Sequence, residues 1–103
     1  WVRSAHDVRN IGTLGTQPGK RDELVALLSR RSTELEEACL LYEVGVNDSE
    51  PDTVFVAEIW ISAEAHQNSL QLESVRAAIA GAMPLLSGHM SGHQFTIAGS
   101  PLR

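Results

Sequence analysis

Apolar residues recur along this chain with a spacing that changes between strand-like alternation and helical periodicity, and each change marks an expected element. Val8–Thr16 carries Ile11 and Leu14 among glycines, which predicts a first strand weakened by those glycines. Over residues 20–37 the leucines fall on one stripe and the charged residues mostly elsewhere. This pattern predicts an amphipathic helix of about five turns.

Two dense apolar runs follow at residues 39–46 and 53–61, and both are rich in β-branched and aromatic side chains. The polar cluster at 47–52 predicts a turn, so we expect the two runs to form an antiparallel hairpin. Their apolar residues occupy both alternating faces. This pattern predicts a sheet that is covered on both sides.

The last third of the chain completes the expected fold. Ser62 is a suitable N-cap for a helix, or two short ones, running to about residue 86. A loop at 87–92 and a last strand at 94–98 follow. The order β-α-β-β-α-β is that of ferredoxin-like α+β folds, in which both helices cover one face of an antiparallel sheet. The other apolar face then needs a second copy of the chain, so we expect a homodimer.

Length and composition indicate one small domain, with residues 1–7 as a polar lead-in and 8–103 as the folded unit. The formal charge of −5 and the lack of clustered basic residues argue against a nucleic-acid partner. Since no apolar run approaches the roughly 20 residues that span a bilayer, no membrane association is expected. A lone cysteine, Cys39, is typical of a reducing compartment, so we expect a cytoplasmic protein.

Three short motifs share an order and spacing along the chain, at residues 18–24, 39–44 and 57–65. Their most specific part combines Tyr42 with the alternating residues Glu58, Trp60, Ser62 and Glu64. From about residue 9 to residue 98 the chain resembles the antibiotic biosynthesis monooxygenase domain family, and within it a quinol monooxygenase-like sub-branch. The resemblance implies a dimeric α+β barrel and a cofactor-free reaction of molecular oxygen with quinols or aromatic polyketides.

Several positions depart from that family. Many members carry one His nine residues after the strand-end Trp and another five residues later, where this chain has Ser69 and Ser74. The haem-degrading branch has Trp at the position of Ser69 and His at that of Ile79, so haem breakdown is not expected. In several members an Asn on the first strand assists catalysis, which makes Asn10 a candidate for substrate binding.

His66 is the first candidate for catalysis, because imidazole exchanges protons near neutral pH and could deprotonate a phenol or hydroquinone. The alternative is an exposed or capping His in the first turns of a helix. Ser69 lies one turn further along the same helix face. It could orient His66 or bind a substrate oxygen, and packing as a small residue is its alternative role.

The expected substrate-binding residues lie on strands and on the second helix. Trp60 and Glu58 share one strand face, so Trp60 could stack on an aromatic substrate while Glu58 binds its hydroxyl group. Both also suit structural roles. Tyr42 and Arg76 complete the set, although Tyr42 suits a core position and Arg76 a surface ion pair.

No cofactor or metal is expected. The chain has no phosphate-binding glycine loop, and His89 and His93 lack a third ligand nearby. The leading hypothesis is a cofactor-independent monooxygenase that uses oxygen on a small phenolic, quinol or polyketide-like aromatic substrate. The alternatives are a non-enzymatic small-ligand-binding module with a stress or regulatory role, and an oxygen-independent isomerase or decarboxylase.

Overall fold

The computed structural model describes residues 7–30 and 32–102. Most of the expected lead-in, residues 1–6, lies outside the described residues, as do Arg31 and Arg103. Asp7, which the sequence assigned to the lead-in, belongs to the packed structure, since it is only 1% exposed. Its carbonyl oxygen accepts a hydrogen bond from the amide of Ile97 at 2.9 Å.

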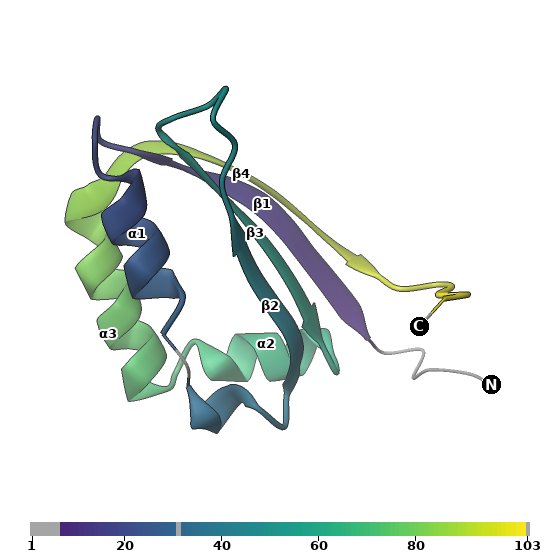
Figure 1. Cartoon of the computed structure of the whole chain (residues 1–103). Coiled ribbons are helices and arrows are strands. Elements are labelled where there is room, and N and C mark those ends of the chain that lie inside the picture. The colour runs from purple at the N-terminus through teal and green to yellow at the C-terminus, as the bar shows by residue number, and fades with distance from the viewer. Residues whose placement is uncertain (1–6, 31, 103) are drawn as a thin grey trace.

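One antiparallel sheet of four strands, in the order β2-β3-β1-β4, runs through the molecule (Figure 1). Its strands are β1 (Val8–Thr16), β2 (Cys39–Gly45), β3 (Thr53–Trp60) and β4 (Leu86–Thr96). The predicted hairpin is confirmed as β2 and β3, which pair antiparallel. This strand order, with the connections through helices, confirms the predicted ferredoxin-like α+β fold.

All three helices cover the same face of the sheet (Figure 1). They are α1 (Arg21–Leu28), α2 (Ala63–Ser69) and α3 (Glu73–Ala82), with short 3-10 turns at Thr33–Leu35 and Met83–Leu85. α1 and α3 lie side by side, and the core joins Leu24, Val54 and Ala82. α2 crosses near the ends of β2 and β3 and contacts β3. The sequence left open one helix or two short ones after Ser62, and the structure has two, over residues 63–82.

The first helix is shorter than the predicted 20–37, because it ends at Leu28. Ser32 is extended, with φ −126° and ψ 113°, and Leu35 belongs to a separate 3-10 turn. Serine side chains compete with the helix for backbone hydrogen bonds, so Ser29 and Ser32 favour a break there. The leucine stripe indicated the buried face correctly but not the helix end.

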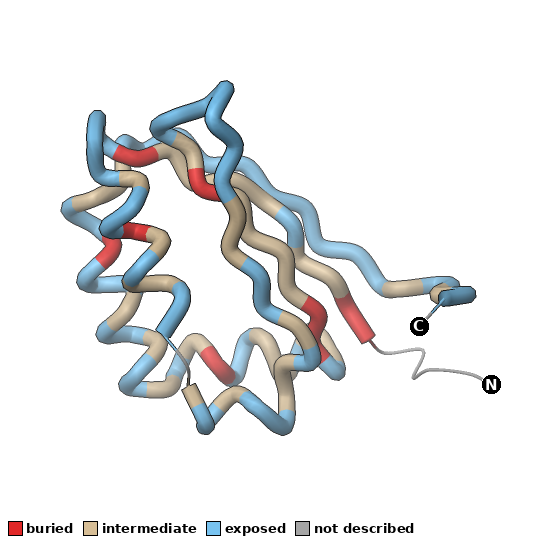
Figure 2. Tube along the Cα trace, in the orientation of Figure 1, coloured by how far each residue is buried: buried red, intermediate tan, exposed pale blue. Residues whose placement is uncertain are grey.

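The last strand was placed wrongly by the sequence, which predicted a loop at 87–92 and a strand at 94–98. β4 instead begins at Leu86 and pairs with β1 through this Ser-Gly segment. Its residues have low intrinsic strand preference, so pairing with β1 decides the conformation. Gly92 lies opposite Gly12, where the two backbones approach closely. Figure 2 shows that β4 is exposed along most of its length.

The sheet face turned away from the helices carries exposed apolar side chains. Ile11 on β1 is 39% exposed and Phe95 on β4 is 45% exposed. The sequence predicted two apolar faces for the hairpin strands, and in β3 Val54 packs in the core while the next residue, Phe55, lies on the opposite face. No helix covers this second face in the described part of the chain.

The glycine pair generates a test of the sheet register. An alanine Cβ at Gly12 would lie far inside contact distance of the Ser91 carbonyl oxygen, whereas at Gly92 the nearest atom is 3.4 Å away. Neither glycine has a positive φ, so the difference arises from space alone. We expect Gly12→Ala to lower the free energy of unfolding by about 1–3 kcal/mol. Gly92→Ala should change it by about 0.5 kcal/mol or less.

Urea denaturation of the two variants measures this difference. Equal losses for the two alanines would contradict the β1–β4 register described above.

Candidate active site

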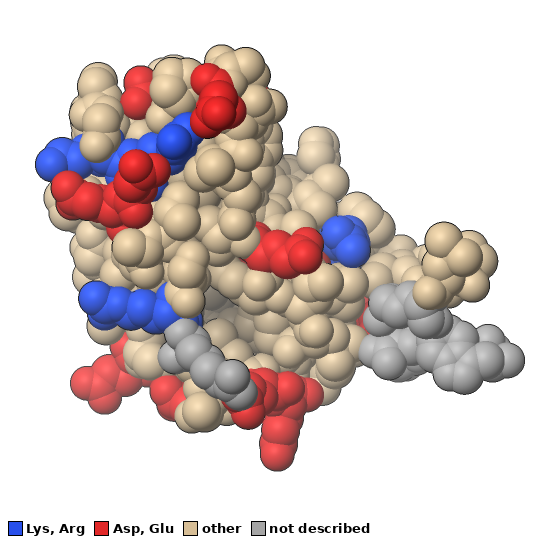
Figure 3. All heavy atoms as spheres, viewed as in Figure 1, with Lys and Arg blue, Asp and Glu red and all other residues tan. Residues whose placement is uncertain are grey.

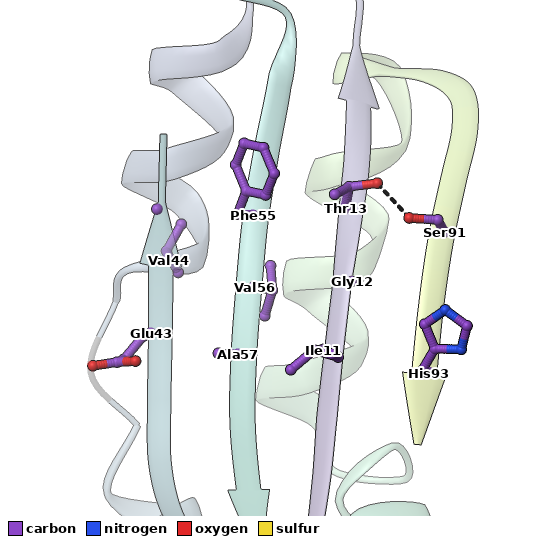
Figure 4. Close-up of a pocket in the computed structure, with 11 residues that line it drawn as sticks. Ile11, Gly12, Thr13, Glu43, Val44, Phe55, Val56, Ala57, Ser91 and His93 are labelled. Atoms are coloured by element: carbon purple, nitrogen blue, oxygen red, sulfur yellow. Dashed lines mark hydrogen bonds between the residues drawn. The ribbon is translucent and has the colours of Figure 1, made fainter. Parts of the chain in front are cut away.

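The sheet is hollowed on both faces. On the face away from the helices a hollow of about 590 Å³ includes Ile11, Thr13 and Phe55 in its lining (Figure 4). The hydroxyl groups of Thr13 and Ser91 hydrogen-bond to each other there at 2.6 Å. Each hydroxyl therefore already has a partner, and the remaining surface is largely apolar.

A second hollow, the helix-side cleft, has a volume of about 480 Å³. Ligand pockets typically measure roughly 300–1,000 Å³, so this cleft can hold a small aromatic molecule. Four of the sequence-predicted site residues line it together, from β1, β2, β3 and α2 respectively: Asn10, Tyr42, Glu58 and His66. The strand register explains this meeting, because Asn10 and Tyr42 both lie opposite Glu58.

The cleft exists partly because two residues in its lining have no side chains. Gly12 and Gly92 are cross-strand partners on β1 and β4, and both line the cleft. Leu14 and Val56 contact the hydrophobic core and also line the cleft, so they separate the two. Among the lining residues that were not predicted as site residues are all those from β4, namely Met90, Gly92, His93 and Gln94. The alternation of Asn10, Gly12 and Leu14 could have indicated the β1 part of the lining.

Trp60 lies beside the cleft and not in its lining, since it is only 2% exposed. Its indole Nε1–H donates a hydrogen bond to Glu58 Oε1 at 2.8 Å. Its ring also contacts the imidazole of His66, with 5.1 Å between ring centroids and a tilt of 55°. One buried side chain thus positions two of the polar residues in the cleft.

Two serine hydroxyl groups fix the main chain of α2, which carries His66. The Ser62 hydroxyl caps the helix by accepting the Ala65 amide at 2.9 Å, as its sequence position predicted. Ser69 is buried and donates to the main-chain oxygen of His66 at 2.6 Å, not to the imidazole. Among residues 7–30 and 32–102, the buried Nδ1 of His66 has no hydrogen-bond partner.

Tyr42 and Cys39 add two weak acids beside Glu58. Tyr42 is 43% exposed and so does not occupy the core position that its sequence suited. Its partial burial, with contributions from the charge of Glu58 and from Cys39, raises the pKa of Tyr42 to about 12. Burial also raises the pKa of the Cys39 thiol, which donates to the Leu41 carbonyl at 3.3 Å. Both groups are therefore neutral at physiological pH and are hydrogen-bond donors.

Arg76 does not join this group. It is exposed on α3 and is absent from the residues that line the cleft.

Figure 3 shows basic and acidic side chains interspersed on the face in view, without a continuous basic surface.

The described residues contain neither a candidate metal cluster nor a membrane-spanning helix. No cluster of three or more His, Cys, Asp or Glu side chains within them could hold a metal ion. None of the helices in these ranges is long and apolar enough to cross a membrane.

Comparison with known proteins bears on both the fold and the function. The model of the antibiotic biosynthesis monooxygenase family matches residues 7–81. A candidate monooxygenase of this kind from Chloroflexus aurantiacus J-10-fl is 34% identical, with a TM-score of 0.83, and the match covers 91% of this chain and 95% of that one. No curated protein matches the chain.

Two more distant structures show the fold alone. A candidate monooxygenase from Deinococcus radiodurans is 24% identical with a TM-score of 0.75, over 90% of this chain and 94% of that one. Another from Bacteroides thetaiotaomicron VPI-5482 is 15% identical with a TM-score of 0.82, over 98% of both chains.

Tyr42 provides a direct test of the cleft's electrostatics because it is the only tyrosine in the sequence. Ultraviolet titration of the folded protein should give a midpoint of about 12, against the ordinary 10.0. Glu58→Gln should lower this midpoint, because it removes a neighbouring negative charge. Since folding favours the neutral phenol, this contribution to stability is present below about pH 10 and is lost toward pH 12. An ordinary midpoint in the native protein would contradict the placement of Tyr42.

Proposed function

The chain belongs to the antibiotic biosynthesis monooxygenase family, and from this premise we propose that it is a cofactor-independent monooxygenase. Its substrate is a small phenolic, quinol or polyketide-like aromatic molecule that binds in the helix-side cleft. The observation that carries the proposal is the meeting of Asn10, Tyr42, Glu58 and His66 around one hollow of suitable size.

The cleft supplies what such a reaction needs from a protein. Gly12 and Gly92 leave room for a flat ring against the sheet, and Leu14 and Val56 provide apolar contacts. The polar side chains hold the substrate hydroxyl and assist its deprotonation, which produces an electron-rich anion. With an anthrone-type substrate a CH₂ group becomes C=O, one atom of O₂ enters the product and the other leaves as water. The CH₂ group supplies all four electrons that reduce O₂ and both hydrogens of the water, so no further reductant is required.

Homodimerisation is part of the proposal. The sheet face away from the helices exposes Ile11 and Phe95 around a largely apolar hollow (Figure 4). A second copy of the same face, related by a two-fold axis, would remove these side chains from water. Two sheets packed in this way would form the α+β barrel that the family resemblance implied.

Oxygen uptake by the metal-stripped protein with a panel of hydroquinones and anthrones tests the catalytic proposal. We expect protein-dependent uptake that falls at least tenfold in His66→Ala, because a polar contact to the substrate oxygen is lost. A tenfold fall corresponds to about 1.4 kcal/mol of barrier. Gly92→Val should raise KM by filling the cleft floor, where an added Cβ meets only ordinary contacts.

Glu50→Gln is the matched control, since Glu50 is exposed in the turn between β2 and β3 and should leave uptake unchanged. Uptake that is insensitive to both His66→Ala and Gly92→Val would place the reaction outside this cleft. Retention of aromatic ligands without any uptake would favour a binding module, and substrate turnover without oxygen would favour an isomerase or decarboxylase.

Analytical ultracentrifugation of two isoleucine variants tests the dimer. Ile11→Asp should shift the protein to the monomer, because it puts a charge into the proposed interface. Ile79→Asp is the control: Ile79 is 48% exposed on α3, against 39% for Ile11 on the bare sheet face. A monomeric native protein, or equal effects of the two aspartates, would contradict this interface.

A further inference from the structure

The helix-side cleft contains two groups that could remove a proton from a substrate hydroxyl, the imidazole of His66 and the carboxylate of Glu58. We infer that Glu58 accepts this proton, while His66 donates a hydrogen bond to the same substrate oxygen. The inference rests on the proposed function and reverses the roles that the sequence suggested for these two residues. Three observations support it.

The first observation is the environment of His66. Its Nδ1 is closed to water-sized molecules and has no hydrogen-bond partner among the described residues. A buried N–H without an acceptor is rarer in proteins than a buried acceptor without a donor, so the single proton of the neutral ring belongs on Nε2. His66 also lines the cleft, and because Nδ1 is closed off, the Nε2 edge is the one nitrogen edge that the ring can offer to a ligand there. At that edge the neutral ring donates a hydrogen bond and cannot accept a proton.

The second observation is the way in which Glu58 is held. Among the described residues, Trp60 is the one hydrogen-bond partner of this carboxylate, through Nε1–H to Oε1. Its other oxygen, Oε2, is therefore available to a ligand in the cleft that Glu58 lines. Because an ionised carboxylate has only acceptor sites, a substrate hydroxyl beside it must point its hydrogen at Glu58.

The third observation concerns the remaining titratable groups around Glu58. Cys39 and Tyr42 on β2 are neutral donors, since burial raises the pKa of both. His93 on β4 and His66 on α2 line the same cleft. Glu58 is the only carboxylate among the described residues that line it.

The proposed proton transfer breaks one O–H bond and forms another. The O–H bond of the phenol breaks, the proton forms a new O–H bond with Glu58 Oε2, and the electron pair remains on the phenol oxygen. His66 Nε2–H donates to that developing oxyanion. A carboxylate is a weak base toward phenols, so donors that stabilise the anion make the transfer feasible.

The tautomer of His66 can be measured without any substrate or reaction. Long-range ¹H–¹⁵N correlation spectra distinguish Nε2–H from Nδ1–H for each of the four histidines, and the signals missing from His66→Gln identify His66. The expected result is the Nε2–H form near neutral pH. An Nδ1–H form would overturn the inference, because Nε2 would then be free to accept the proton.

Equilibrium binding of 4-nitrophenol, which does not consume oxygen, tests the role of Glu58. Kd is measured at pH values below and above the ionisation of the ligand. The ratio of the Kd of the phenolate to that of the neutral phenol is the preference for the neutral phenol. Native protein should prefer the neutral phenol, and Glu58→Gln should lower that preference at least tenfold because the repelling charge is gone. His66→Ala should raise it, because the donor to the oxyanion is lost, and Glu50→Gln should leave it unchanged.

Failure of this inference and failure of the proposed function are distinguishable. If His66→Ala lowers the preference for the neutral phenol at least tenfold and Glu58→Gln leaves it unchanged, His66 is the proton acceptor and the inference is overturned. The proposed function survives that result. Absence of binding by 4-nitrophenol and by the hydroquinone panel contradicts the proposed function, and the role of Glu58 falls with it.

Discussion

The contact of Leu24, Val54 and Ala82 determines how this small protein is arranged. It joins α1 and α3 to the central strand β3 and lies toward the β1 end that carries Leu14. α2 contacts β3 separately, close to Trp60. The stretch of sheet between these two attachments keeps polar residues and paired glycines, and so it forms the cleft. The same hydrophobic packing that stabilises the fold thus defines where a ligand fits.

The sequence allowed correct prediction of the elements whose own residues determine them. The dense apolar strands β2 and β3, the capping residue Ser62 and the leucine stripe of α1 are local signals, and each corresponds to an observed element. β4 is different, because a Ser-Gly segment becomes a strand only through its pairing with β1. The early end of α1 likewise reflects competition by serine side chains that periodicity does not record.

The candidate site was predictable as a set of residues but not as an arrangement. Alternation placed Glu58 and Trp60 on one face, and the hairpin brought Tyr42 opposite Glu58. No local pattern indicated that Trp60 would be buried, holding Glu58 by a hydrogen bond and packing on His66. The lining by Gly92 depends on the β1–β4 register, which was missed. Arg76, plausible from its place on the second predicted helix, lies away from the cleft.

The proposed reaction requires that the helix-side cleft, and not the hollow on the opposite face, receives the aromatic ligand. Chemical-shift mapping of the ¹⁵N-labelled protein with 4-nitrophenol tests this claim directly. We expect the largest shifts at Asn10, Glu58 and His66, with Thr13 and Phe55 little changed. Largest shifts at Thr13 and Phe55, on the sheet face away from the helices, would contradict it.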